Sequence, residues 1–169
     1  DSTDGQGLLA AFAEQAPGFD FGAAPAVVIG AGGAARAAIA AVLEAGAPEV
    51  RIFNRSAEKA RVLATALGAG AVAVRRVEDA LVGVGAIINA TPSSPAIPLE
   101  LVGESVVVMD MVYRPLATPL LRRARERGLR TVDGLAMLIA QARPSFEALF
   151  GAPPPNIDVR AVALAAGDL

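Results

Sequence analysis

Three small residues with the spacing G-x-G-x-x-A stand where a short apolar run gives way to an alanine-rich segment. Gly30, Gly32 and Ala35 occupy these positions. The first permits a tight strand-to-helix turn, the second lets the backbone approach a pyrophosphate, and the third lets the helix pack close to the strand. The free N–H groups at a helix start attract an anion. The pattern predicts a phosphate-binding turn, formed by Gly30, Ala31, Gly32, Gly33 and Ala34, and the alternative is an ordinary tight βα turn.

The end of the second apolar run carries the residues that would select the nucleotide. Sites that prefer NAD place Asp or Glu here, whereas this chain has Asn54, Arg55 and Ser56. A guanidinium can stack on adenine and pair with a 2′-phosphate through two hydrogen bonds. Lys59, one helical turn further on, would extend the positive rim. We therefore predict NADP as the cofactor, and the alternative is that Arg55 and Lys59 are solvated surface residues.

The composition excludes several kinds of chemistry. The chain has 169 residues, of which 54% are hydrophobic, and a net charge of -2, so it reads as a globular domain rather than a nucleic-acid binder. It has no cysteine and no histidine, which removes disulfides, thiolate and imidazole metal sites, and Ser-His or Cys-His catalysis. No apolar run approaches the ~20 residues of a membrane span. Proton transfer would therefore use Asp, Glu, Tyr or the single lysine, Lys59.

Apolar runs alternate with helical patterns along most of the chain. Strands are expected at residues 26–29, 49–53, 71–74, 86–89, 106–110 and 129–132. Helices are expected at residues 8–15, 34–46, 57–67, 77–81, 119–127, 134–150 and 157–166, with a turn at 1–5 and a Pro/Gly linker at 16–25. This alternation predicts an α/β fold with a doubly wound, mostly parallel sheet, which is a Rossmann-like NAD(P)-binding domain. The polar strand ends at 54–56, 89–91 and 110–113 should then share one rim with the glycine turn.

The chain resembles the cofactor-binding half of the shikimate dehydrogenase family, including its quinate/shikimate branch. The matching segments fall in family order and cover nearly the whole chain: STDGQG (2–7), VIGAGGAARA (28–37), NRS (54–56), INATP (88–92), MDMVYRPLATPLL (109–121) and DGLAMLIAQARPSFEALFG (133–151). The resemblance implies a two-domain, cytoplasmic enzyme of chorismate and aromatic amino-acid biosynthesis. Such an enzyme interconverts 3-dehydroshikimate and shikimate with NADP.

The resemblance also implies roles for single residues. Asp4 matches the catalytic aspartate that touches the substrate and pairs with a lysine, and its alternative role is helix capping. Tyr113 and Gln141 are expected to bind the substrate rather than to serve as a packing aromatic and an exposed glutamine. The residues that match positions around the nicotinamide, where core packing is the alternative for the methionines, are Met111, Gly134 and Met137. Thr91, at the end of the fourth strand, is either a contact to the cofactor ribose or a turn residue.

We expect three parts in the chain: a linking helix with the catalytic aspartate at 1–16, the NADP-binding domain at 17–150, and a C-terminal helix at 151–169. The family's substrate domain and its lysine are not in this sequence, so the segment alone should be inactive. Ser2, Ser94-Pro95 and Ala136 depart from the family pattern. A quinate or aminoshikimate dehydrogenase, or a non-catalytic nucleotide-binding module, therefore stays open, as does a homodimer.

Overall fold

Six short strands form one sheet, whose central strands are largely apolar runs buried on both faces, as a parallel sheet covered by helices requires. The computed structural model describes residues 3–167, so Ser2 and the start of the predicted first turn lie outside it. The strands are β1 (Ala26–Ile29), β2 (Val50–Phe53), β3 (Ala71–Val74), β4 (Ala86–Asn89), β5 (Val107–Asp110) and β6 (Arg130–Asp133). Every predicted strand is confirmed to within one residue at each end.

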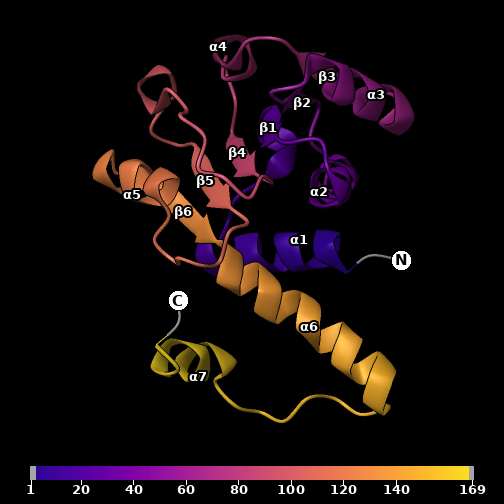
Figure 1. Ribbon diagram of the computed structural model, residues 1–169, viewed down its shortest axis with the longest axis vertical. Helices are drawn as coiled ribbons and strands as arrows, with labels where there is room; N and C mark the ends of the chain where they lie inside the picture. The colour runs from indigo at the N-terminus through magenta and orange to yellow at the C-terminus, as the bar shows by residue number, and fades with distance from the viewer. Residues whose placement is uncertain (1–2, 168–169) are drawn as a thin grey trace.

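All neighbouring strands are parallel, in the order β3-β2-β1-β4-β5-β6 (Figure 1). This is the doubly wound order, and ligands in such sheets bind beyond the carboxyl ends where the order reverses, here between β1 and β4. The register aligns the last residues of five strands in one row: Phe53, Ile29, Asn89, Asp110 and Asp133. The strand ends therefore do share one rim, as the sequence predicts.

Helices cover both faces of the sheet and were placed closely by the sequence. They are α1 (Asp4–Gln15), α2 (Gly33–Glu44), α3 (Ala57–Leu67), α4 (Val77–Ala80), α5 (Pro119–Glu126), α6 (Gly134–Phe150) and α7 (Val159–Ala165). The first differs most, because it begins at Asp4 rather than Leu8. Thr3 precedes it without a side-chain capping bond, and Asp4, for which helix capping is the alternative role, is instead the first helical residue.

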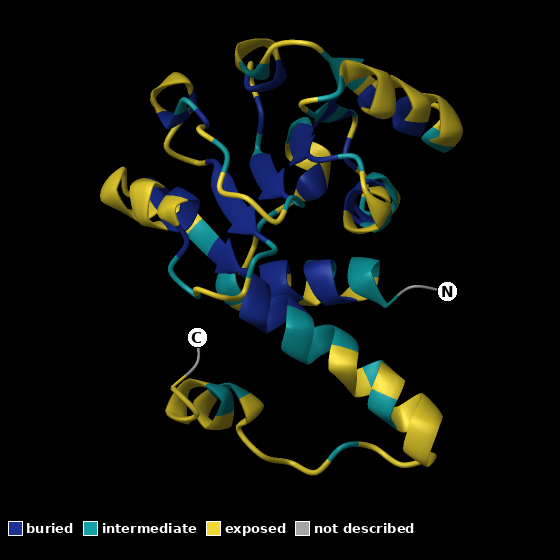
Figure 2. Ribbon diagram, viewed as in Figure 1, coloured by how far each residue is buried: buried dark blue, intermediate teal, exposed yellow. Residues whose placement is uncertain are grey.

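Alternate residues of each strand point into two separate cores, as the period of two in a strand requires. Val28 faces the core under α1, α2, α3 and α6, whereas Val27 and Ile29 face the core under α4 and α5. Figure 2 shows the sheet as the most deeply buried layer, while the far half of α6 and all of α7 stay largely exposed. Among residues 3–167, no helix is both long enough and apolar enough to cross a membrane.

The predicted linker at 16–25 is more ordered than its Pro/Gly content suggests. Phe21–Ala23 forms a short 3₁₀ turn, and the rings of Phe12, Phe19 and Phe21 cluster with centroid separations of 4.8–5.3 Å. Aromatic rings packed in this way stabilise one another beyond their buried area. The cluster holds the end of α1 against the start of β1.

Candidate functional site

The glycine turn between β1 and α2 has the geometry that a phosphate site needs. Gly30 has φ +120°, and a Cβ there would lie 3.1 Å from Ala90 O and 3.1 Å from Thr91 Cγ2, so only glycine fits. Ala35 is fully buried against the strand, as predicted from the spacing. The sharp turn leaves the start of the twelve-residue helix α2 pointing along the rim.

Gly32 and Gly33 are glycines for a different reason. Gly32 has φ -94° and ψ -169°, which any residue adopts, and no described atom lies within 4 Å of a Cβ built on either residue. Neither backbone strain nor internal packing therefore requires glycine here. What the missing side chains leave open is the surface in front of the α2 N-terminus, where free N–H groups favour an anion. The turn fits a pyrophosphate.

A hollow of about 270 Å³ lies beside this turn and gathers most of the predicted cofactor residues. Its lining comprises Gly30, Ala31, Gly32, Asn54, Arg55, Ser56, Lys59, Ala90, Thr91 and Pro92. Gly33 lines an adjoining hollow of about 380 Å³ with Arg36, Glu58 and Lys59. The predicted residues after β1, β2 and β4 are thus brought together at the reversal of strand order.

The charge of this hollow is positive. Arg55 and Lys59 are exposed, and within residues 3–167 neither forms an ion pair. No carboxylate is among the described lining residues of the 270 Å³ hollow, and Glu58 next to it pairs with Arg61 at 2.7 Å. Two free cations near a phosphate-binding turn suit a further phosphate group.

Internal hydrogen bonds shape the turn after β2. Ser56 Oγ accepts from Lys59 N at 3.4 Å and so caps α3. Asn54 Nδ2 donates to Ser56 O at 3.0 Å, which holds the turn that presents Arg55. Asn54 and Ser56 therefore stabilise the conformation of this turn.

Thr91 is likewise engaged within the protein. Its hydroxyl donates to Asn89 Oδ1 at 2.7 Å, and its N–H donates to the same atom at 3.1 Å. Asn89 Nδ2 in turn donates to Ser93 O at 2.8 Å. These contacts show that Thr91 acts as a turn residue, and its contact with the cofactor ribose stays a prediction. Ser94, one of the departures from the family pattern, accepts from Leu120 N at 3.0 Å and ties this loop to α5.

A second cavity, of about 180 Å³, gathers the residues predicted for the substrate and the nicotinamide. Its lining comprises Asp4, Ala34, Met111, Tyr113, Gly134, Met137, Leu138 and Gln141. These residues come from α1, α2, the segment after β5, and α6, so the cavity exists only in the folded chain. Gln141 Oε1 is buried and has no hydrogen-bond partner among the described residues. A buried acceptor without a donor is costly, which makes it fit to receive a hydroxyl from a ligand.

Two glycines allow these elements to converge. A Cβ on Gly134 would collide with Met111 O, so the start of α6 is in backbone contact with the segment after β5. A Cβ on Gly7 would lie 2.9 Å from Gln141 Cβ and 2.9 Å from Met137 O. The helices α1 and α6 are therefore in close contact where Gly7 faces Gln141 and Met137. Among the described residues, Tyr113 is a large side chain on this rim that stays 44% exposed.

Two neighbouring carboxyl groups beneath the rim titrate in opposite directions. Burial raises the pKa of Asp110 above its ordinary value, and hydrogen bonds from Val112 N–H and Asn89 to its Oδ1 only partly oppose this. Burial also acts to raise the pKa of Asp133, but hydrogen bonds from Arg160, Ala136 N–H and Gln15 outweigh it and lower that pKa. The two pKa values shift in opposite directions because Asp133 has a cationic partner, Arg160, and Asp110 has none among the causes of its shift.

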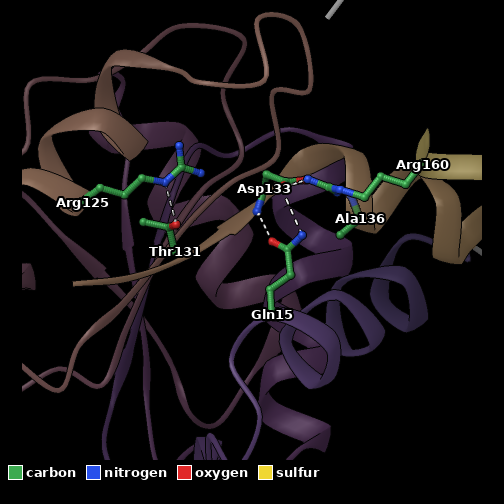
Figure 3. Close-up of polar contacts among 6 residues, drawn as sticks. All are labelled: Gln15, Arg125, Thr131, Asp133, Ala136 and Arg160. Atoms are coloured by element: carbon green, nitrogen blue, oxygen red, sulfur yellow. Dashed lines mark hydrogen bonds and ion pairs between the residues drawn. The ribbon is translucent and has the colours of Figure 1, made fainter. Parts of the chain in front are cut away.

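Asp133 caps α6 and has two further side-chain partners that the sequence analysis did not predict. Asp133 Oδ1 accepts from Ala136 N at 3.0 Å, which confirms the cap. Gln15 at the end of α1 and Arg160 on α7 also bind this carboxylate (Figure 3). They lie 118 and 27 residues away from Asp133 in the chain, and no local pattern links residues so far apart.

A larger hollow, of about 570 Å³, lies elsewhere and holds none of the predicted residues. Its lining includes Gly85, Val106 and Arg130, which stand at the amino ends of β4, β5 and β6. Ligands of doubly wound sheets bind at the opposite, carboxyl ends. Position in the fold therefore outweighs volume, and the two smaller cavities on the glycine rim form the candidate site.

Comparison with known proteins agrees with this geometry. The family model "Shikimate / quinate 5-dehydrogenase" matches residues 12–111. A shikimate dehydrogenase (NADP(+)) of Caulobacter vibrioides is 53% identical over 175 residues, which cover 97% of this chain and 61% of the relative. One of Rhodospirillum rubrum is 46% identical, over 91% of this chain and 59% of the relative. This chain thus spans about three fifths of the length of these relatives.

Solved structures show the same fold. A quinate dehydrogenase from Corynebacterium glutamicum in complex with NAD gives a TM-score of 0.85 at 29% identity, covering 98% of this chain and 62% of that one. A shikimate 5-dehydrogenase from Thermus thermophilus in complex with NADP(H) and shikimate gives 0.77 at 39% identity, covering 91% and 58%. The glycine turn, the sheet order and these matches lead to one conclusion. The chain belongs to the shikimate / quinate 5-dehydrogenase family.

Proposed function

We propose that this chain is the NADP-binding part of a shikimate dehydrogenase, which transfers hydride reversibly between NADPH and 3-dehydroshikimate to give shikimate. One observation carries the proposal: two cavities open on the same carboxyl edge of the sheet, one cationic and one lined by hydrogen-bond acceptors. The nicotinamide ring supplies the hydride when the cofactor is bound. The protein supplies position and charge.

The cationic end supports NADP as the cofactor. Gly32 and the start of α2 would hold the pyrophosphate, and Arg55 with Lys59 would pair with a 2′-phosphate. An NAD site would instead need an acid at the end of β2, where this chain has Asn54. Met111, Gly134 and Met137 would then surround the nicotinamide in the second cavity.

The acceptor end supports a polyhydroxylated substrate. The carboxylate of Asp4 and the free Oε1 of Gln141 line one cavity with Tyr113. Both oxygens can accept hydrogen bonds from ring hydroxyls, and together they would orient the carbon that exchanges hydride. Tyr113 would close the edge of the cavity.

The proton of the reaction has no obvious source within this chain. The sequence contains no histidine or cysteine, and its one lysine, Lys59, lines the other cavity. We therefore propose that the lysine which the family resemblance implies, on a substrate domain outside this chain, exchanges the proton across from Asp4. The same proposal places the enzyme in the cytoplasm and leaves a homodimer open.

The test compares this chain with the longer protein that includes the substrate domain. NADPH formation that depends on shikimate, followed by absorbance, should occur with the longer protein. The chain alone should be slower by at least about 10²–10⁴-fold, the usual contribution of a general acid–base group. Turnover with quinate in place of shikimate would favour the quinate branch. Equal rates for both proteins would place the proton donor within these residues, with Tyr113 as the first candidate.

A further inference from the structure

A single carboxylate at the end of β6 joins three helices that are far apart in the sequence. Asp133 is only 4% exposed, and Figure 3 shows it between Gln15 of α1, Ala136 of α6 and Arg160 of α7. Its Oδ1 accepts from Ala136 N at 3.0 Å and from Arg160 Nη1 at 3.1 Å. Its Oδ2 accepts from Gln15 Nε2 at 3.0 Å and from Arg160 Nη2 at 2.6 Å. Each carboxylate oxygen thus accepts two hydrogen bonds.

The geometry of this group is rigid. Two parallel N–H···O bonds between a guanidinium and a carboxylate fix the relative orientation of both planes. Gln15 adds a return bond, because its Oε1 accepts from Asp133 N at 2.9 Å. The negative charges of Glu14 and Asp158 also raise the pKa of Arg160 and so favour its charged form. Asp133 is therefore held from α1, from α6 and from α7.

The element that Asp133 caps carries one wall of the second cavity. Gly134, Met137 and Gln141 all line that cavity, and all lie within the first eight residues of α6. Gly134 touches the backbone of Met111, another lining residue. A tilt of the first turns of α6 would therefore move this wall and displace the Met111 backbone that lies against it. The opposite end of α1 supplies Asp4 to the same cavity, so the Gln15 contact ties this helix to the same carboxylate.

The last helix reaches this carboxylate without entering the cavity. None of the seven residues of α7 is buried, and no residue of α7 lines the second cavity. Within residues 3–167, the two hydrogen bonds from Arg160 to Asp133 are the side-chain hydrogen bonds found between α7 and the sheet or another helix. Figure 1 shows the segment after α6 returning so that α7 lies near the start of that helix. Arg160 is thus placed to act on α6 at its N-terminus.

We propose that Arg160 is a positioning residue of the active site. Through its paired bonds to Asp133 it sets the first turns of α6, and through Gln15 it sets α1, so that α7 governs the shape of the nicotinamide and substrate cavity from outside. The adenosine end, built on α2 and α3, lies outside this network. The inference rests on the proposed function for the identity of the ligands.

The test measures the two ends of the cofactor separately, on this chain. The affinity for NADP⁺ is compared with that for 2′-phospho-ADP-ribose, which has the adenosine and both ribose-phosphate groups but no nicotinamide. The ratio of the two affinities reports the contacts made in the second cavity. In Arg160→Met this ratio should fall about 2- to 30-fold, the usual range for a residue that acts through another. The affinity for 2′-phospho-ADP-ribose should stay the same.

Two variants control for general destabilisation. Arg125→Met removes a guanidinium that donates to Thr131 Oγ1 at 3.1 Å, and Thr131 lies on β6, the strand that ends at Asp133. This variant should leave the ratio of the two affinities unchanged. Arg160→Lys keeps the charge but not the paired bonds, so its ratio should lie between those of wild type and Arg160→Met. Where Arg160→Met does not fold, Arg160→Lys decides the question by the same measurements.

Amide hydrogen exchange gives a second readout that needs no ligand. Residues 136–138 at the start of α6 should exchange faster in Arg160→Met, whereas those of α2 should not. A lower melting temperature with an unchanged ratio and unchanged exchange at 136–138 would overturn the inference and leave Arg160 a merely structural residue. Failure of wild type to bind either ligand would instead overturn the proposed function, and exchange alone would then decide the role of Arg160.

Discussion

Replacing Gly32 by alanine should separate cofactor binding from folding, because the protein itself makes no use of this glycine. The added methyl group would meet no described atom within 4 Å, and the φ of -94° suits any residue. Loss of a flexible glycine from the unfolded chain stabilises by about 0.4–1 kcal/mol. Alanine is a poorer helix N-cap than glycine, which costs about 0.5–1.5 kcal/mol. The two terms nearly cancel, so the melting temperature should stay within about 4 °C of wild type.

The effect on binding should be much larger. The methyl group would occupy the space over which the pyrophosphate approaches the α2 N-terminus. Loss of one hydrogen bond from a backbone N–H to a charged oxygen costs about 1.5–3 kcal/mol. That free energy corresponds to a roughly 10- to 100-fold weaker NADP⁺ affinity.

Calorimetric titration with NADP⁺ and a thermal melt of the same sample give both quantities. Gly103→Ala is the matched control, because Gly103 also has open space around its Cβ position and no positive φ, but lies before β5 at the opposite edge of the sheet. It should change neither quantity. Wild-type affinity in a well-folded Gly32→Ala protein would refute the placement of the pyrophosphate, and so would an equal loss in the control.

Three further predictions concern single charges and one close contact. Arg55→Asp should lower NADP⁺ affinity about 10- to 100-fold and NAD⁺ affinity much less. The control Arg127→Asp should change neither affinity. Equal losses for both cofactors by calorimetry would exclude a contact between Arg55 and the 2′-phosphate. Burial raises the pKa of Asp110, so the wild-type fold loses stability as pH rises from the ordinary carboxyl value of 3.8 through the raised value. Asp110→Asn, which cannot ionise, should therefore gain stability relative to wild type as pH rises through this range in urea unfolding. A pH-independent difference between the two proteins would contradict this. Gly7→Val should force α1 from α6 and destabilise by about 1–3 kcal/mol or more, with weakened substrate binding; a neutral effect would show that the helices have room to separate.

The opposite pKa shifts of two adjacent strand ends give a matched comparison. The depressed pKa of Asp133 means that its contribution to stability is present above the ordinary carboxyl value of 3.8 and is lost as pH falls through the lower folded value. Asp133→Asn should therefore lose most stability near neutral pH and approach wild type in acid, the reverse of Asp110→Asn. Parallel pH profiles for the two variants would show that Arg160 does not control the charge of Asp133.

Most strands were predictable because they are short, largely apolar runs that end at a glycine or a polar residue, and the parallel sheet follows from their alternation with helices. The start of α1 was not, because Gly5 and Gly7 are poor helix formers. The structure gives the reason: a Cβ on Gly5 would lie 2.9 Å from Ala41 Cβ, and one on Gly7 would press on α6. Packing against two neighbouring helices outweighs the local preference, and no window of sequence contains both partners.

The same two glycines explain why the candidate site could be predicted only in part. Residues at the glycine turn and after β2 lie in local motifs, and their chemistry can be read from their types. The second cavity depends on distances between helices, since α1 reaches α2 through Gly5 and α6 through Gly7. α2 begins at the glycine turn beside the first cavity, and α6 begins at one wall of the second cavity. The close contacts that α1 makes with these two helices therefore link both cavities of the candidate site, and Asp4 takes its place in the second cavity from that packing rather than from its own position in the chain.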